Sequence, residues 1–362
     1  MTGPQSLTPA DLAAVAAKLE REPIEDLRID FEDGFDERTD EEEDAAVDAV
    51  VAAIAELAAA DGLPPHIGIR SKCFEAPTRD RAVRTFDRFI TGLARTGAFG
   101  PSGGLPEGLE LTLPKVTTVD QVTAMVGICE RLEAANGLPA GRIRFEVQVE
   151  TPQVVLGPDG AVPLARLIHA GGGRVSSLHY GTYDYSASLG VAGGHQSMEH
   201  PVADFAKSMM QVAIAGTGVR MSDGSTNILP LGDAQQRDGA WALHARLVRR
   251  SLERAIYQGW DLHPHQLPTR YLASYAFFRT GLESTCERLR NSVHRIESAV
   301  MDEPANAKAL AAFLLRGVDC GAVPESEVVE RVDLTAAELP ALAHPARPAA
   351  SSAAAPESKD VK

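Results

Sequence analysis

The sequence predicts an α/β fold: a TIM (β/α)8-type barrel whose first strand is missing or degenerate, followed by a C-terminal helical extension. Short strand-like stretches alternate with helical ones along most of the chain, which is the pattern of a parallel sheet. The length of 362 residues suits one barrel with an appendage. Neither a Gly-x-Gly-x-x-Gly nor a Walker A sequence is present, so the open nucleotide-binding sheets lack their usual signature.

The predicted elements follow from hydrophobic periodicity and from the Gly and Pro residues between them. Strands are expected at 27–32, 66–70, 109–115, 142–150, 175–180, 219–224 and 259–264. Helices are expected at 7–22, 45–60, 78–96, 118–136, 164–170, 201–215, 238–258, 270–300 and 305–316. We expect three parts, which are the barrel with the active site (1–268), a helical region (269–338) and an Ala/Pro/Ser-rich disordered tail (339–362).

The strand expected at 142–150 has two chemically different faces. Apolar side chains alternate with polar ones, and Pro152 ends the pattern because proline has no N–H to donate to a sheet. If the polar face meets water, its residues carry no functional meaning. If that face lies inside a barrel, Glu150 is a charged group at the C-terminal rim, where the chemistry of such barrels takes place.

Composition excludes some classes of function. The formal net charge of −15, from 50 acidic and 35 basic residues, weighs against binding to nucleic acid or to an anionic membrane. The four cysteines are widely scattered with no Cys-x-x-Cys pair, so we expect neither a zinc site nor disulfides, and a cytoplasmic location. The N-terminus has no signal-peptide pattern, and the most apolar window, 45–60, is too short to span a membrane.

Polar residues on the strand faces opposite the apolar ones are expected to point into the barrel. They are Arg28, Asp30, Glu32, His66, Arg70, Arg144, Glu146, Gln148 and Glu150. Buried charges are costly unless they are paired, so an acidic rim requires a counter-charge. Mg²⁺ is typically bound by one or two carboxylates together with waters and substrate oxygens. Glu150 and Asp184, each at the end of a strand, form the natural pair, and the planar fork of Arg70 suits a carboxylate.

Six stretches, in order along the chain, carry a resemblance to a known family. They are Leu27-Arg28-Ile29-Asp30-Phe31-Glu32-Asp33-Gly34, Ile69-Arg70, Leu113-Pro114-Lys115, Val149-Glu150-Thr151-Pro152, Tyr180-Gly181-Thr182-Tyr183-Asp184-Tyr185 with Leu189-Gly190, and Gly259-Trp260-Asp261-Leu262-His263-Pro264-His265-Gln266. They resemble, respectively, the motifs D-L-E-D, V-R-V-N, L-P-K, I-E-T-A, F-G-x-x-D…L-G and G-K-x-x-I-H-P-x-Q. These motifs belong to the HpcH/HpaI-type aldolase, citrate lyase β-subunit and malyl-CoA lyase group of the phosphoenolpyruvate/pyruvate superfamily.

The resemblance implies a magnesium-dependent carbon–carbon lyase or aldolase. Its substrate would be a small 2-oxo or hydroxy acid, or its coenzyme A thioester, and the reaction would pass through a metal-stabilised enolate. The implied residues are Glu150 and Asp184 as ligands of Mg²⁺ or Mn²⁺, Arg70 as the group that binds the oxo-acid carboxylate, Glu32 and Asp33 beside the metal's water shell, and Gly181, Thr182 and Tyr183 along the substrate. We also expect a homo-oligomer, with the helices after residue 270 as its interface.

Two departures from the family motifs leave alternatives open. The opening R-S-x-L-x-V-P strand is absent, and Trp260-Asp261 replaces the lysine of the late motif. One alternative is a malate-synthase-like condensation with glyoxylate, for which Asp223 is the candidate base. Another is a non-catalytic barrel that binds an oxo acid or a partner protein. In that case Arg70 would pair with Glu32 or Asp30, and the metal-ligand candidates would form salt bridges at the rim.

Overall fold

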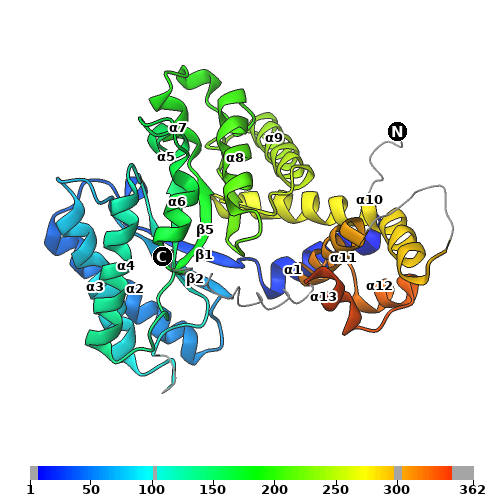
Figure 1. The fold of residues 1–362 in the computed structure, drawn as a ribbon, viewed down its shortest axis with the longest axis horizontal. Coiled ribbons are helices and arrows are strands. Elements are labelled where there is room, and N and C mark those ends of the chain that lie inside the picture. The colour runs from blue at the N-terminus through cyan, green and yellow to red at the C-terminus, as the bar shows by residue number, and fades with distance from the viewer. Residues whose placement is uncertain (1–6, 101–103, 297–303, 345–362) are drawn as a thin grey trace, which may run out of the picture. The chain divides into compact units, whose positions relative to one another are not determined.

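The fold is that of a computed structural model, which describes residues 7–100, 104–296 and 304–344 (Figure 1). The chain divides into two compact units. The larger unit is Leu19–Ala273, and the smaller unit combines Met1–Lys18 with Ser274–Lys362. All candidate site residues belong to the larger unit.

A seven-stranded parallel sheet forms the centre of the larger unit, and its strands are arranged in chain order. They are β1 (Asp26–Asp30), β2 (His66–Arg70), β3 (Leu109–Leu113), β4 (Phe145–Val149), β5 (Val175–Tyr180), β6 (Arg220–Asp223) and β7 (Gln258–Gly259). The sheet curls as a half-barrel of the TIM type. Within the described residues no strand precedes β1, so the predicted fold class, including the missing first strand, is confirmed.

Helices connect the strands and cover the outside of the sheet (Figure 1). They are α2 (Asp40–Ala59), α3 (Arg79–Thr96), α4 (Val119–Asn136), α5 (Pro152–Val155), α6 (Pro163–Ala170), α7 (Thr182–Ser188), α8 (Pro201–Ile214) and α9 (Ala234–Glu253), with 3-10 turns at Asp33–Phe35, Gly193–His195 and Pro264–Gln266. The helix α1 (Pro9–Arg21) precedes β1, and most of it belongs to the smaller unit. Local sequence sets several helix ends. Thr39 and Glu42 form a capping box at the start of α2, and Gly137 ends α4 in the left-handed conformation.

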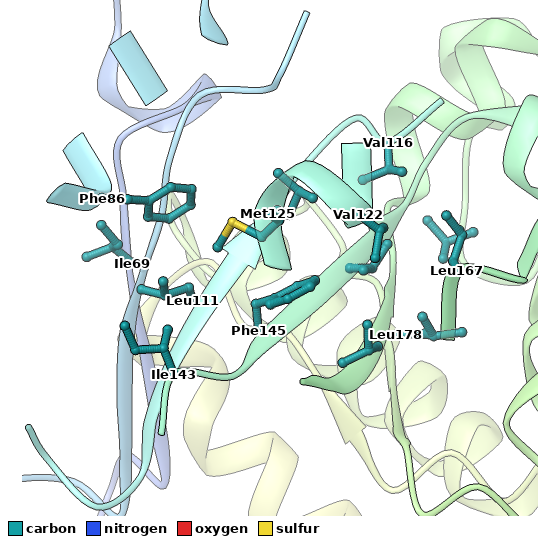
Figure 2. Close-up of a cluster of buried hydrophobic side chains, with 14 of the residues drawn as sticks. Ile69, Phe86, Leu111, Val116, Val122, Met125, Ile143, Phe145, Leu167 and Leu178 are labelled. Atoms are coloured by element: carbon teal, nitrogen blue, oxygen red, sulfur yellow. The ribbon is translucent and has the colours of Figure 1, made fainter. Parts of the chain in front are cut away.

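The main core lies between the outer face of the sheet and these helices (Figure 2). Each central strand contributes outward-facing apolar side chains, such as Ile69 from β2 and Phe145 from β4. Phe86 of α3 and Met125 of α4 pack against them and are fully buried. Because the hydrophobic faces of the strands meet the helices, their polar faces are directed into the half-barrel.

The inner face of the sheet is polar and buried. Glu110, Glu146, Gln148 and Glu150 have almost no solvent exposure. The prediction of polar residues directed inward is therefore correct for the second half of the stretch 142–150. It is wrong for Arg144, which is exposed because β4 begins one residue later, at Phe145.

The smaller unit is helical. After α10 (Leu267–His294), whose first turns belong to the larger unit, it contains α11 (Pro304–Asp319), α12 (Glu325–Val332) and α13 (Glu338–Ala343), and α13 packs on α11. The ring of Phe313 in α11 contacts the rings of Phe277 and Phe278 in α10. The expected disordered tail (339–362) is wrong for 339–343, which are helical, and its residues from 345 onward lie outside the described part. The predicted homo-oligomer interface after 270 stays a prediction.

Over the described ranges, no helix has both the length and the apolar composition needed to cross a membrane.

Candidate functional site

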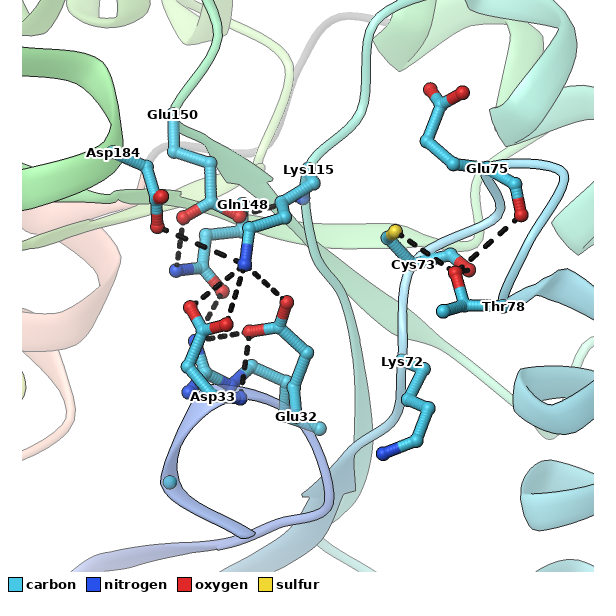
Figure 3. Close-up of polar contacts among 12 residues, drawn as sticks. Glu32, Asp33, Lys72, Cys73, Glu75, Thr78, Lys115, Gln148, Glu150 and Asp184 are labelled. Atoms are coloured by element: carbon cyan, nitrogen blue, oxygen red, sulfur yellow. Dashed lines mark hydrogen bonds and ion pairs between the residues drawn. The ribbon is translucent and has the colours of Figure 1, made fainter. Parts of the chain in front are cut away.

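A cluster of charged side chains lies at the carboxyl ends of β1 to β5 (Figure 3). Lys115, two residues after β3, is at its centre. Its ammonium group contacts Glu32 and donates to both carboxylate oxygens of Asp33 at 2.7 Å, and it lies 3.9 Å from Asp184. Its backbone N–H donates to Oε1 of Glu150 at 2.6 Å. Lys115 thus contacts both metal-ligand candidates and two of the three catalytic candidates, Glu32 and Asp33.

The backbone of Lys115 adopts a left-handed conformation, with φ of 50°. This conformation is uncommon for a residue with a side chain and costs free energy that the surrounding contacts must offset. The two interactions of Lys115 explain why it is retained. Pro114 precedes it, and the turn directs the N–H to Glu150 while the side chain reaches the loop after β1.

Glu150 is a buried carboxylate, with only 1% of its surface exposed. Besides the bond from Lys115, its Oε2 accepts a hydrogen bond from Nε2 of Gln148 at 2.8 Å. Burial, together with repulsion from Asp184, raises the pKa of Glu150 to about 8. Burial and a like charge nearby both disfavour the ionised form of Glu150, and a positive charge placed beside it would oppose that effect.

Asp184, the second predicted metal ligand, lies in the first turn of α7 after β5. Its side chain is 45% exposed, in contrast to Glu150. Both carboxylates project into the cluster of Figure 3, and each contacts Lys115. The structure therefore brings together one buried and one accessible carboxylate.

Arg70, at the end of β2, is held by Asp30. Nε and Nη2 of Arg70 donate to the two oxygens of Asp30 at 2.7 and 2.5 Å. Nη1 faces the other way, 3.4 Å from Oε1 of Gln148 and 3.3 Å from Oε2 of Glu32. Burial by itself would lower the pKa of Arg70, but the bond to Asp30 raises it, so the guanidinium stays charged. Asp30 thus occupies the guanidinium edge formed by Nε and Nη2, and Nη1 faces the carboxylate cluster.

An aromatic contact to Arg70 was not foreseen from the sequence. The guanidinium carbon of Arg70 lies 5.3 Å from the ring centroid of Trp260. The ring of His179 stacks on Trp260, with 4.0 Å between the two ring centroids. Burial lowers the pKa of His179 well below its usual value, so its ring is neutral. The signal available was Trp260 itself, which replaces a lysine of the family motif.

The predicted substrate residues Gly181, Thr182 and Tyr183 have structural partners. A Cβ at Gly181 would lie 2.5 Å from Cβ of Glu150, so a glycine leaves room for that side chain. Thr182 is buried, and the hydroxyl of Tyr183 accepts from the backbone N–H of Asn227 at 2.6 Å. Gly181 is adjacent to the cluster, whereas the hydroxyl of Tyr183 braces the loop after β6.

Asp223, the candidate base of the condensation alternative, is buried in an ion pair. Nζ of Lys207 lies 3.0 Å from its Oδ2, and the hydroxyl of Ser251 donates to the same oxygen at 2.6 Å. Both carboxylate oxygens are occupied, since Oδ1 also accepts from the N–H of Gly224. Asp223 is thus engaged with partners of its own chain and does not reach the charged cluster of Figure 3 as a further member.

Comparison with known proteins identifies the family but no activity. A family model described as "Domain of unknown function (DUF6986)" matches residues 2–347. The chain belongs to this family. A search of curated proteins finds no match to this DUF6986 chain.

Solved structures show what the DUF6986 fold is similar to. A citrate lyase from Burkholderia xenovorans LB400 is 18% identical, with a TM-score of 0.62 over 90% of this chain and 94% of that one. A magnesium/glyoxylate complex of Haloferax volcanii malate synthase is 16% identical, with a TM-score of 0.54 over 91% and 95% of the two chains. A pyruvate/acetyl-CoA ternary complex of that malate synthase is 14% identical, with a TM-score of 0.51 over 76% and 68%. At these identities the likeness shows a shared fold.

The donor set of the DUF6986 site fits a magnesium ion. Among the described residues, no group of three or more His, Cys, Asp or Glu side chains is arranged to hold a metal ion. Mg²⁺ usually keeps several waters and needs only one or two protein carboxylates, and Glu150 and Asp184 would supply two. The charges also favour a cation, because five carboxylates share only two cationic groups, on Arg70 and Lys115.

Proposed function

We propose that this protein is a magnesium-dependent carbon–carbon lyase or aldolase that acts on a small 2-oxo or hydroxy acid or its coenzyme A thioester. The observation that carries the proposal is the buried Glu150 beside the accessible Asp184, at the carboxyl ends of neighbouring strands. This is the end of a TIM-type barrel where active sites are found. The shared fold with a citrate lyase and with a malate synthase in a magnesium/glyoxylate complex supports it.

In this proposal Glu150 and Asp184 hold the metal, and Arg70 binds the substrate carboxylate through Nη1, whose contacts with Gln148 and Glu32 are the longer ones of this guanidinium. A bound Mg²⁺ would supply Lewis-acid polarisation of the substrate carbonyl as the carbon–carbon bond breaks. Asp30 fixes the guanidinium plane of Arg70, so the fork does not have to be ordered when the substrate arrives. Glu32 and Asp33, both bonded to Lys115, border the same space and suit a role beside the metal's waters.

The condensation alternative has one observation in its favour, which is the fold shared with malate synthase. The structure weakens its candidate base, because Asp223 is paired with Lys207. A binding module without catalysis would need Arg70 but not the two metal carboxylates. Cleavage and binding can therefore be separated by experiment.

The first test is a calorimetric titration of Mg²⁺ into wild type, Glu150→Gln and Asp184→Asn. The substitutions remove a charge while keeping the shape of the side chain, so we expect each to weaken binding by about tenfold or more. Glu253→Gln, in an exposed surface pair with Arg249, is the matched control. Absence of Mg²⁺ binding in wild type, or unchanged binding in both site variants, would refute the metal assignment.

The second test is turnover of malyl-CoA and of 4-hydroxy-2-oxo acids. Arg70→Lys keeps a positive charge beside Asp30 but loses the planar fork, so we expect the KM for these acids to rise in a variant whose thermal stability is retained. Oxo-acid binding with no turnover of any of these substrates, in the presence of Mg²⁺, would favour the binding module instead.

A further inference from the structure

Lys115 contacts both of the proposed metal ligands. Nζ is 3.9 Å from Oδ2 of Asp184, while the backbone N–H of the same residue is bonded to Glu150. We propose that Lys115 is a built-in cation that competes with the divalent ion for this carboxylate cluster and thereby sets the affinity and selectivity of the site. This inference rests on the metal site of the proposed function and goes beyond it by naming the residue that tunes it.

The position of the ammonium group is fixed from two sides. The N–H of Lys115 is tied to the buried Glu150, so the start of the side chain cannot leave the site. At the other end, the ammonium is bonded to Glu32 and to both oxygens of Asp33. Contacts with two carboxylates favour the charged form of this amine over the neutral one.

Of these contacts, the one with Asp33 can shift when a stronger cation arrives. The side chain of Lys115 is 27% exposed and that of Asp33 is 56% exposed, so the pair lies at the solvent boundary. Ion pairs in contact with water contribute little net stability. The ammonium can therefore retreat toward Asp33 while the backbone of Lys115 continues to hold Glu150.

Charge decides which ions can enter. A monovalent ion brings the same charge as the ammonium, which is already in place and tethered, so it gains nothing by displacing it. A divalent ion interacts twice as strongly with the same carboxylates, because Coulomb energy is proportional to charge. Lys115 thus excludes Na⁺ and K⁺ and lowers the affinity for Mg²⁺ at the same time.

A matched pair of lysines makes this testable. Lys72 follows β2 near the same end of the sheet, but its ammonium pairs with Glu43 at 3.2 Å and donates to the carbonyl of Phe31 at 3.0 Å, apart from the cluster (Figure 3). Lys115→Met removes the ammonium and keeps the backbone N–H that binds Glu150. Lys115→Arg keeps the charge, and Lys72→Met removes a lysine charge outside the cluster.

The experiment is calorimetric titration of Mg²⁺ into the full chain, with KCl or tetramethylammonium chloride at equal ionic strength. We expect Lys115→Met to bind Mg²⁺ at least about tenfold more tightly than wild type, with Lys115→Arg and Lys72→Met within about threefold of it. We also expect KCl, but not tetramethylammonium chloride, to weaken Mg²⁺ binding by Lys115→Met, because K⁺ can now enter the site. In wild type the two salts should act alike.

The outcomes separate this inference from the proposed function. If wild type binds Mg²⁺ and a folded Lys115→Met binds it equally or more weakly, Lys115 does not compete and the inference is wrong. If only Lys115→Met binds Mg²⁺, the competition is supported and the proposed magnesium-dependent activity of wild type is refuted. If neither protein binds Mg²⁺, both ideas are overturned.

Discussion

Glu146 makes the stability of this protein depend on pH in a direction that can be calculated. It lies on the inner face of β4, four residues before Glu150, and is 3% exposed. Burial raises its pKa from 4.5 to about 7; the positive charge of Arg28 opposes this shift and the negative charge of Glu110 adds to it. Its Oε1 accepts a hydrogen bond from the hydroxyl of Thr112 at 3.3 Å.

The direction in which stability changes with pH follows from proton binding. Between pH 4.5 and about 7 the folded chain holds a proton on Glu146 that the unfolded chain has lost, so unfolding releases that proton and stability falls as pH rises. One pKa unit corresponds to about 1.4 kcal/mol, so the contribution of Glu146 present below pH 4.5 amounts to about 3 kcal/mol and is lost by the time pH exceeds about 7. Glu146→Gln mimics the protonated form and should lack this loss.

The assay is urea unfolding of wild type and Glu146→Gln at several pH values across this window. Other groups titrate in both proteins, so the difference between the two curves isolates Glu146. We expect the free energy of unfolding of the variant, relative to that of wild type, to rise by about 3 kcal/mol between the low and the high end of this pH range. Glu253→Gln, at the surface, should run parallel to wild type. Parallel curves for Glu146→Gln would show that Glu146 is ionised in the folded protein and would refute the reasoning.

Three further predictions concern the core and the site. Phe86→Ala should lower the free energy of unfolding by about 3–5 kcal/mol, measured in urea, because a fully buried ring leaves a cavity; a loss below about 1 kcal/mol would contradict the packing of α3 on the sheet. Gly181→Ala should weaken Mg²⁺ binding about tenfold or more in a titration, since the new methyl would displace Glu150; wild-type affinity would show that Glu150 is not the ligand. Trp260→Ala should raise the Kd for a small 2-oxo acid about threefold to thirtyfold, because Arg70 loses the ring that lies beside its guanidinium. Trp241→Ala, outside the site, should leave this Kd unchanged. Equal effects of the two substitutions would contradict the role of Trp260.

Alternation along 142–150 was enough to predict which side chains enter the half-barrel, but not where the strand begins. Glu146, Gln148 and Glu150 are directed inward, as a period of two requires. Arg144 continues the same pattern but is exposed. The register between β4 and β5 shifts between Phe145 and Glu146, so pairing with the neighbouring strand, which the sequence does not show, decides which residues belong to the sheet.

The last predicted strand, 259–264, illustrates a second limit. Only Gln258 and Gly259 pair with β6, and the chain then turns so that Trp260 reaches His179 and Arg70. The strand predicted over 259–264 is therefore wrong beyond Gly259, because local sequence does not distinguish a strand from a short segment buried by distant partners. The partners of Trp260 lie on β2 and β5, far away in sequence. Lys115 is similar, since only its contacts with Glu32 and Asp33 reveal its central place.

Gln148 joins the two halves of the proposed site. Its amide oxygen accepts from Nη1 of Arg70, and its amide nitrogen donates to Oε2 of Glu150. This orientation is set by Arg70, because a guanidinium can only donate, so the amide oxygen of Gln148 faces it and the amide nitrogen faces Glu150. A group that binds at the Nη1 edge of Arg70 therefore acts on the same amide that orients Glu150. Substrate carboxylate and metal ion would then share one rigid side chain, which explains why a polar amide occupies a buried position between two charges of opposite sign.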